Sequence, residues 1–132
     1  MRTILAAALA GLVLSAGVAH AGDPDKGKSV FNKCKSCHMI GPNAKTRVGP
    51  ELNGIVGRPM GSVEGFHYSK ELKEMGEAGG VWDADKLNAY IKKPKAMIPH
   101  GRMPFPGLAN DQQRDDLVAY LKQFAADGSQ AQ

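Results

Sequence analysis

Hydrophobic residues recur at helical spacing in four short stretches of the chain, and the last stretch shows the pattern most clearly. Its apolar side chains follow the i, i+3, i+4, i+7 spacing of one helix face: Leu117, Tyr120, Leu121 and Phe124. Asn110 stands before them as a possible N-cap, with Gln113 three residues later, as in a capping box. This pattern predicts an amphipathic helix near the C-terminus.

Three earlier stretches carry weaker versions of the same pattern. One covers residues 25–37, one begins at Ser69 as a cap and ends at Gly76, and one follows Trp82 and stops at Pro94. Their inward-facing side chains are Val30, Phe31 and Cys34 in the first, Leu72 and Met75 in the second, and Leu87, Tyr90 and Ile91 in the third.

Long segments rich in glycine and proline separate these stretches, and residues 39–65 contain too many of both for regular structure. No segment alternates with period two over a useful length, so the predicted fold class is all-α, with about four short helices and no sheet. Because long structureless loops are unusual in a compact domain, we expect a ligand buried beneath them. Residues 127–132 have the composition of a flexible tail.

The first 21 residues have the pattern of a secretory signal peptide. Arg2 provides a positive start, residues 4–18 are almost wholly apolar, and Ala19-His20-Ala21 fits the A-x-A cleavage site. This predicts one soluble domain of residues 22–132, exported to the periplasm. The alternative is an uncleaved anchor, because the apolar run approaches the roughly 17–25 residues that span a bilayer.

Cys34-Lys35-Ser36-Cys37-His38 is the one strong chemical motif, since C-x-x-C-H is typical of c-type haem attachment. Two cysteines three residues apart on a helical turn point the same way, so both sulfurs can bond to the vinyl groups along one haem edge. His38 follows directly and can supply the proximal imidazole to the iron. We therefore predict one covalent haem c held by Cys34, Cys37 and His38.

Other uses of the two cysteines are weaker hypotheses. A disulfide would close so short a loop that it would restrict the unfolded chain little. A thioredoxin-like redox pair belongs with a strand and helix pattern that this chain lacks. A zinc site needs four ligands, and beyond the motif only His67 and His100 remain in the mature chain.

The residues alone leave the second axial ligand open. Methionine commonly completes haem iron in electron-transfer proteins, and the mature chain offers Met39, Met60, Met75, Met97 and Met103. Met39 is adjacent to His38 and cannot reach the opposite face, and Met75 belongs to a helix face directed at the core. Met103 has the best setting, in extended chain between Gly101 and Pro106, with Met97 and His100 as competitors.

Three further segments accompany the haem motif: residues 49–58 (GPELNGIVGR), 65–68 (GFHY) and 98–105 (IPHGRMPF). With them, essentially the whole mature sequence resembles class I cytochromes c of the mitochondrial type, including their bacterial c2-type relatives. The resemblance implies the class I cytochrome c fold, with long loops wrapped around one haem. It also implies that the N- and C-terminal helices cross, with Gly27 allowing close approach to Tyr120.

The resemblance implies further cofactor-binding residues, which are Pro50, Arg58, Tyr68, Trp82, Tyr90 and Met103. Met103 becomes the sixth ligand and His100 a loop residue, while the Pro50 carbonyl accepts the N–H of His38 and orients its ring. The two propionates are implied to lie at Tyr68 and at Trp82, and Tyr90 near Met103.

The chain also departs from the family pattern in two places. His100-Gly101 stands where the family often has Gly-Thr, and Arg102 stands where lysine is usual. The segment 62–81 is a few residues longer than in the mitochondrial proteins.

Positive side chains cluster near both predicted sides of the site, although the formal net charge is only +4 and two propionates would offset part of it. They are Lys28, Lys33, Lys35, Lys92, Lys93, Lys95 and Arg102. Such clusters can steer acidic redox partners, such as a quinol:cytochrome c reductase and an oxidase or reaction centre. The chain has no aromatic stacking series, so we expect no nucleic-acid partner.

These features together predict a monomeric one-electron carrier rather than an enzyme. Two alternatives remain at this level. A small peroxidase-like enzyme would need an open iron position and a distal His67 or His100, and a docking subunit would use its haem mainly for structure.

Overall fold

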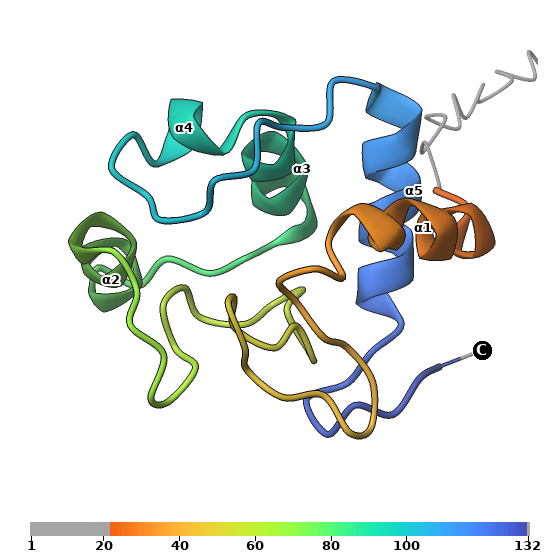
Figure 1. Cartoon of the computed structure of the whole chain (residues 1–132), viewed down its shortest axis with the longest axis horizontal. Coiled ribbons are helices and arrows are strands. Elements are labelled where there is room, and N and C mark those ends of the chain that lie inside the picture. Colours follow the sequence, from red (N-terminus) through yellow and green to blue (C-terminus); the bar gives the residue numbers. More distant parts are fainter. Residues whose placement is uncertain (1–21, 132) are drawn as a thin grey trace, which may run out of the picture.

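The computed structural model describes residues 22–131, and the predicted signal peptide lies outside them. The α-helices are α1 (Pro24–Val30), α2 (Lys70–Glu77), α3 (Ala84–Lys92), α4 (Pro94–Met97) and α5 (Asp111–Lys122) (Figure 1). A 3-10 turn, η1 (Phe31–Lys33), continues α1. The only strand-like pairings in this range are two isolated bridges, so the predicted all-α class is confirmed. No helix in residues 22–131 is long and apolar enough to cross a membrane.

Short polar side chains start the helices at the predicted positions. The side chain of Asn110 accepts a hydrogen bond from the backbone N–H of Gln113 at 2.9 Å, and Ser69 accepts one from Leu72 at 3.2 Å. Each cap satisfies an amide that the helix itself leaves unpaired. Both predicted caps are therefore confirmed.

The short helix α4 was not predicted, although the expected stop of the preceding helix before Pro94 is confirmed. α3 already ends at Lys92, and Pro94 is the first residue of α4, which gives five α-helices in the described range rather than about four. Proline suits this position because its ring fixes a helical φ and the first helical residue needs no N–H donor.

Residues 127–131 correct the prediction of a flexible tail. The chain turns back on itself, and the backbone N–H of Ala131 donates to the carbonyl of Gln123 at 2.8 Å. Gly128 is buried at a positive φ of 85°, where a Cβ would lie 2.3 Å from the carbonyl oxygen of Gly41. Composition did not predict this order because the contact partner lies far away in the sequence.

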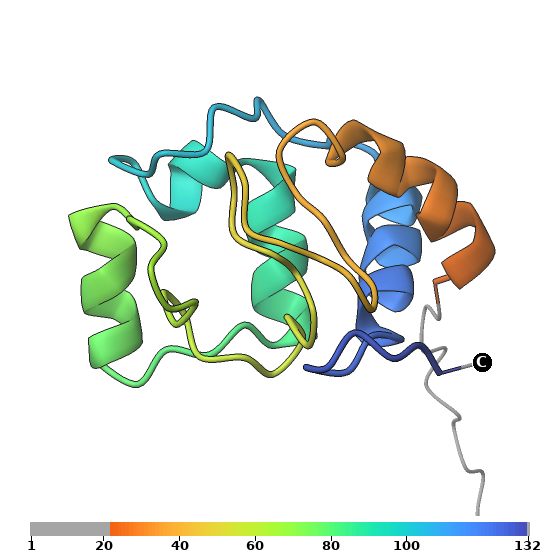
Figure 2. The ribbon, with the colours of Figure 1, turned by 60° about the horizontal axis from the view of Figure 1, so that its bottom comes forward.

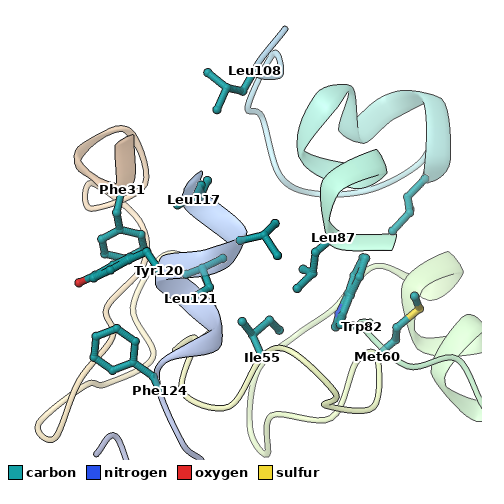
Figure 3. Close-up of a cluster of buried hydrophobic side chains, with 12 residues drawn as sticks. Phe31, Ile55, Met60, Trp82, Leu87, Leu108, Leu117, Tyr120, Leu121 and Phe124 are labelled. Atoms are coloured by element: carbon teal, nitrogen blue, oxygen red, sulfur yellow. The ribbon is translucent and has the colours of Figure 1, made fainter. Parts of the chain in front are cut away.

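The molecule is organised by a crossing of α1 and α5 at one end, while α2 lies at the other (Figures 1 and 2). At the crossing, a Cβ on Gly27 would lie 1.9 Å from the carbonyl oxygen of Asp116 and 2.7 Å from the Cβ of Tyr120. The rings of Phe31 and Tyr120 meet beside it with centroids 5.5 Å apart (Figure 3). The predicted crossing and the role of Gly27 are confirmed.

A buried carboxylate joins the start of the described chain to α5. Asp116 accepts hydrogen bonds from the backbone N–H of Asp23 at 2.8 Å and from the Gln112 side chain at 2.9 Å. These two bonds hold the pKa of Asp116 below its usual value, so the group stays ionised at neutral pH.

We expect the substitution Gly27→Ala to destabilise the protein, because its methyl group would overlap backbone atoms of α5 that cannot move aside. Overpacking of this kind costs about 1–3 kcal/mol, which thermal unfolding followed by circular dichroism would detect. Ser29→Ala, at an exposed position of α1, is the control and should change the midpoint little. Equal midpoints for the two variants would contradict the close crossing.

Candidate functional site

The motif residues follow directly from the end of η1, where the chain makes one further helical turn. The backbone N–H groups of Cys37 and His38 both donate to the carbonyl of Cys34, at 3.2 and 2.9 Å. This turn brings Cys34, Cys37 and His38 to the wall of the same cavity. The structure thus groups the three residues in the way that haem attachment requires.

Both cysteines are free thiols and half-buried. Burial, with a smaller contribution from the neighbouring Cys37, raises the pKa of Cys34 to about 11. The described residues contain no group of three or more His, Cys, Asp or Glu side chains that could hold a metal ion. The disulfide and zinc hypotheses therefore find no support in the described part of the chain.

The ring of His38 is oriented by the loop that follows the motif. Its Nδ1 lies 2.7 Å from the carbonyl oxygen of Pro50, which confirms the predicted contact. A carbonyl can only accept, so Nδ1 carries the proton and Nε2 keeps its lone pair. Burial lowers the pKa of His38 and outweighs the opposing effect of the hydrogen bond to Pro50, which favours the neutral ring that a metal requires.

Gly49 makes room for this ring. A Cβ at Gly49 would lie 2.4 Å from Cε1 and 2.7 Å from Nδ1 of His38. From the sequence, Gly49 was not expected to have this role. Its position directly before Pro50 could have indicated that it lies close to His38.

A cavity of about 770 Å³ extends from the motif into the centre of the molecule. Cavities of roughly 300–1,000 Å³ are typical of cofactor and small-molecule sites. Its apolar lining comes from segments far apart in the sequence, including Phe31, Ile55, Leu87, Ile98, Leu117 and Leu121. Figure 3 shows how these segments are placed: Phe31, Leu117 and Leu121 lie toward the helix crossing, and Leu87 lies beside Trp82.

Met103 lines the same cavity, from the segment between α4 and α5. The hydroxyl of Tyr90 points toward its sulfur at 3.9 Å, so the implied neighbourhood of these two residues is confirmed. The other candidates lie elsewhere. Met60, Met75 and Met97 surround a separate cavity of about 340 Å³, and His100 is exposed.

The side chains implied for the propionates also border the main cavity. Tyr68 is half-buried, and its hydroxyl accepts a hydrogen bond from the backbone N–H of Val63 at 2.9 Å. Trp82 is buried with its ring centroid 4.9 Å from that of Tyr90. These two residues add a hydroxyl and an indole N–H to a lining that is otherwise mainly apolar.

Arg58 fastens the loop that carries Pro50. Its Nη1 donates to the backbone carbonyls of Glu51 and Asn53 at 3.0 and 3.1 Å, and lies 3.3 Å from the Glu51 carboxylate. Its side chain is only 15% exposed and lines the cavity. Arg58 therefore acts on His38 indirectly, by fixing the backbone that orients the ring.

This donor set fits a haem. Two free thiols stand beside an imidazole whose Nε2 is available, a thioether borders the same cavity, and the remaining walls are mainly apolar. Imidazole and thioether are the ligands that electron-transfer haems use.

The chain matches the family model described as "Cytochrome c" over residues 24–125. It is 54% identical to cytochrome c-550 of Ancylobacter novellus over 106 residues, which is 80% of this chain and 99% of that protein. It is 50% identical to cytochrome c2 of Rhodoblastus acidophilus over 109 residues, 83% of this chain and 99% of the relative. The structure of cytochrome c2 from Rhodospirillum centenum aligns with a TM-score of 0.71 and 42% identity, covering 79% of this chain and 99% of that one.

We expect Gly49→Ala to displace the His38 ring, because the added methyl group would overlap its atoms. The holoprotein should show a lower midpoint of thermal unfolding, by roughly the 1–3 kcal/mol of an overpacked site, and an altered Soret spectrum. Asn43→Ala, at an exposed position of the loop between Cys37 and Gly49 that does not line the cavity, serves as the control. An unchanged spectrum and midpoint in Gly49→Ala would contradict the tight contact.

Proposed function

The chain belongs to the cytochrome c family, among its bacterial c2-type members, and we propose that it carries single electrons on one haem c bound through Cys34 and Cys37. When bound, the haem supplies a ferric–ferrous couple. His38 and Met103 are the proposed axial ligands. The observation that supports this assignment is that all four side chains line one apolar cavity.

The protein residues prepare both axial positions. The Pro50 carbonyl fixes the tautomer of His38, so Nε2 is the atom available to iron. On the other side, Tyr90 can donate a weak hydrogen bond to the Met103 sulfur, which would hold the thioether in place. A thioether favours the ferrous state and raises the reduction potential, as suits a carrier within a respiratory or photosynthetic chain.

Occupation of both axial positions separates a carrier from an enzyme. A peroxidase needs a vacant position for peroxide and a distal acid or base. His100 is exposed and does not line the cavity, and His67 lines it but is itself exposed. No residue is thus placed as a buried distal base in the described part of the chain, and the proposal is an electron carrier without catalytic residues.

The proposed location is the periplasm, reached through the signal peptide of residues 1–21, as a monomer. The proposed partners are redox complexes of the quinol:cytochrome c reductase and oxidase or reaction-centre type. Three cationic residues at the cavity mouth, Lys33, Arg47 and Arg102, are exposed and support an acidic docking partner. The further docking cations, Lys28, Lys35, Lys92, Lys93 and Lys95, are also exposed.

Met103→Ala tests the ligand assignment. The ferric protein should lose the long-wavelength sulfur-to-iron band and bind cyanide rapidly, because the sixth position becomes available. Met97→Ala is the matched control, since Met97 precedes the same segment but does not line the main cavity. Persistence of the band in Met103→Ala would refute Met103 as the ligand.

Lys33→Glu tests the docking surface. At low salt its second-order rate of reduction by a quinol:cytochrome c reductase should fall several-fold, because charge reversal removes attraction at the cavity mouth. The deficit should largely vanish near 1 M salt, where the Debye length is about 3 Å. Lys73→Glu, on α2 and also exposed, gives the same change in net charge; an equal loss of rate in both variants would contradict a local docking site.

A further inference from the structure

The loop that presents Met103 is fastened to the body of the protein from inside. Residues 98–103 connect α4 to the extended chain before α5. Ile98 anchors the start of this loop in the core with 1% exposure, and a turn follows in which the Gly101 N–H donates to the Ile98 carbonyl at 2.9 Å. After that turn, Met103 contacts the interior of the protein, where its sulfur lies near the Tyr90 hydroxyl.

Besides a bond from the Lys95 ammonium to the Gly101 carbonyl at 3.2 Å, two contacts fasten the loop from outside, and both come from the segment that begins α2. The backbone N–H of His100 donates to the Glu71 carboxylate at 3.0 Å. The Arg102 guanidinium donates to the carbonyl of His67 at 3.2 Å. Figures 1 and 2 both place the turn after α4 beside the start of α2.

The Glu71 carboxylate is itself well placed for this contact. It lies in the first turn of α2, which is fixed by the buried cap Ser69. A hydrogen bond to an ionised acceptor is roughly twice as strong as a neutral one, although partial exposure reduces its net effect. The contact thus joins two parts of the chain that are 29 residues apart.

We propose that Glu71 and Arg102 are positioning residues that clasp the Met103 loop against α2. This inference rests on the proposed role of Met103 as axial ligand. Opening the loop breaks both contacts, so each one lowers the population of the open state in which the sulfur has moved away. The longer segment 62–81 contains Glu71, and the sequence His100-Gly101-Arg102 departs from the family pattern. On this proposal the two segments act together to hold the Met103 loop in place.

Imidazole binding to the ferric holoprotein measures this opening, since external imidazole needs the position that Met103 vacates. In the variant Glu71→Ala the observed binding rate should rise about 3- to 10-fold, as expected for the loss of one partly exposed, charge-assisted hydrogen bond. Glu71→Gln keeps an uncharged acceptor and should fall between this variant and wild type. Glu74→Ala is the control, because Glu74 lies on the same helix and its side chain, among residues 22–131, pairs only with Lys70.

Amide hydrogen exchange at His100 supplies an independent readout. Exchange of this N–H should accelerate in Glu71→Ala and remain unchanged in Glu74→Ala. The double variant Glu71→Ala with Arg102→Ala should bind imidazole faster than either single variant, because opening of the loop breaks both contacts; a rate equal to that of Glu71→Ala alone would contradict the role of Arg102.

Two outcomes would separate failure of the clasp from failure of the ligand assignment. A wild-type ferric spectrum without the sulfur-to-iron band would overturn Met103 as ligand, whatever the His100 amide does. A normal band, combined with imidazole and exchange rates in Glu71→Ala equal to those in Glu74→Ala, would overturn the clasp alone.

Discussion

A short chain built around a large apolar cavity depends on what holds its loops in place. The crossing of α1 and α5 fixes one end, because Gly27 allows the backbones to touch and so sets the position of the motif that follows η1. Elsewhere much of the cavity wall consists of loops, which face α3 and α5 across the apolar space. Apolar side chains of the wall that remain partly exposed, such as Leu52, Leu72 and Ile91, can be fully buried only against a bound group, and this makes the haem a structural partner as well as the redox centre.

Polar side chains here serve mainly to fasten backbone. Arg58 holds the loop of Pro50, and Asn53 exchanges hydrogen bonds with both backbone groups of Gly41 at 2.8 and 2.9 Å. Arg114, only 4% exposed, donates to the carbonyls of Leu108 and Ala109 just before α5. Loops without regular structure still have to satisfy their backbone groups, and these side chains do so.

Features encoded locally could be predicted from the sequence. The caps at Ser69 and Asn110, the amphipathic face of α5 and the haem motif each depend on residues within a few positions of one another. Contacts between more distant residues, such as that of His38 with Pro50, were expected only from the resemblance to class I cytochromes c. The start of α4 at Pro94, the folded residues 127–131 and the contact of His100 with Glu71 were not predicted. Each depends on which distant segment lies alongside, and one sequence alone carries no direct signal of that.

The hydrogen bond between the Asp23 amide and the Asp116 carboxylate joins positions 93 residues apart. The crossing of α1 with α5 likewise brings together segments that are far apart in the sequence. Closing so large a loop costs chain entropy before any contact repays it. The helix pair therefore cannot form until nearly the entire polypeptide has been synthesised. Until then the turn that carries Cys34 and Cys37 has no α5 to pack against. The contact that closes one end of the folded molecule is thus among the last that its chain can make.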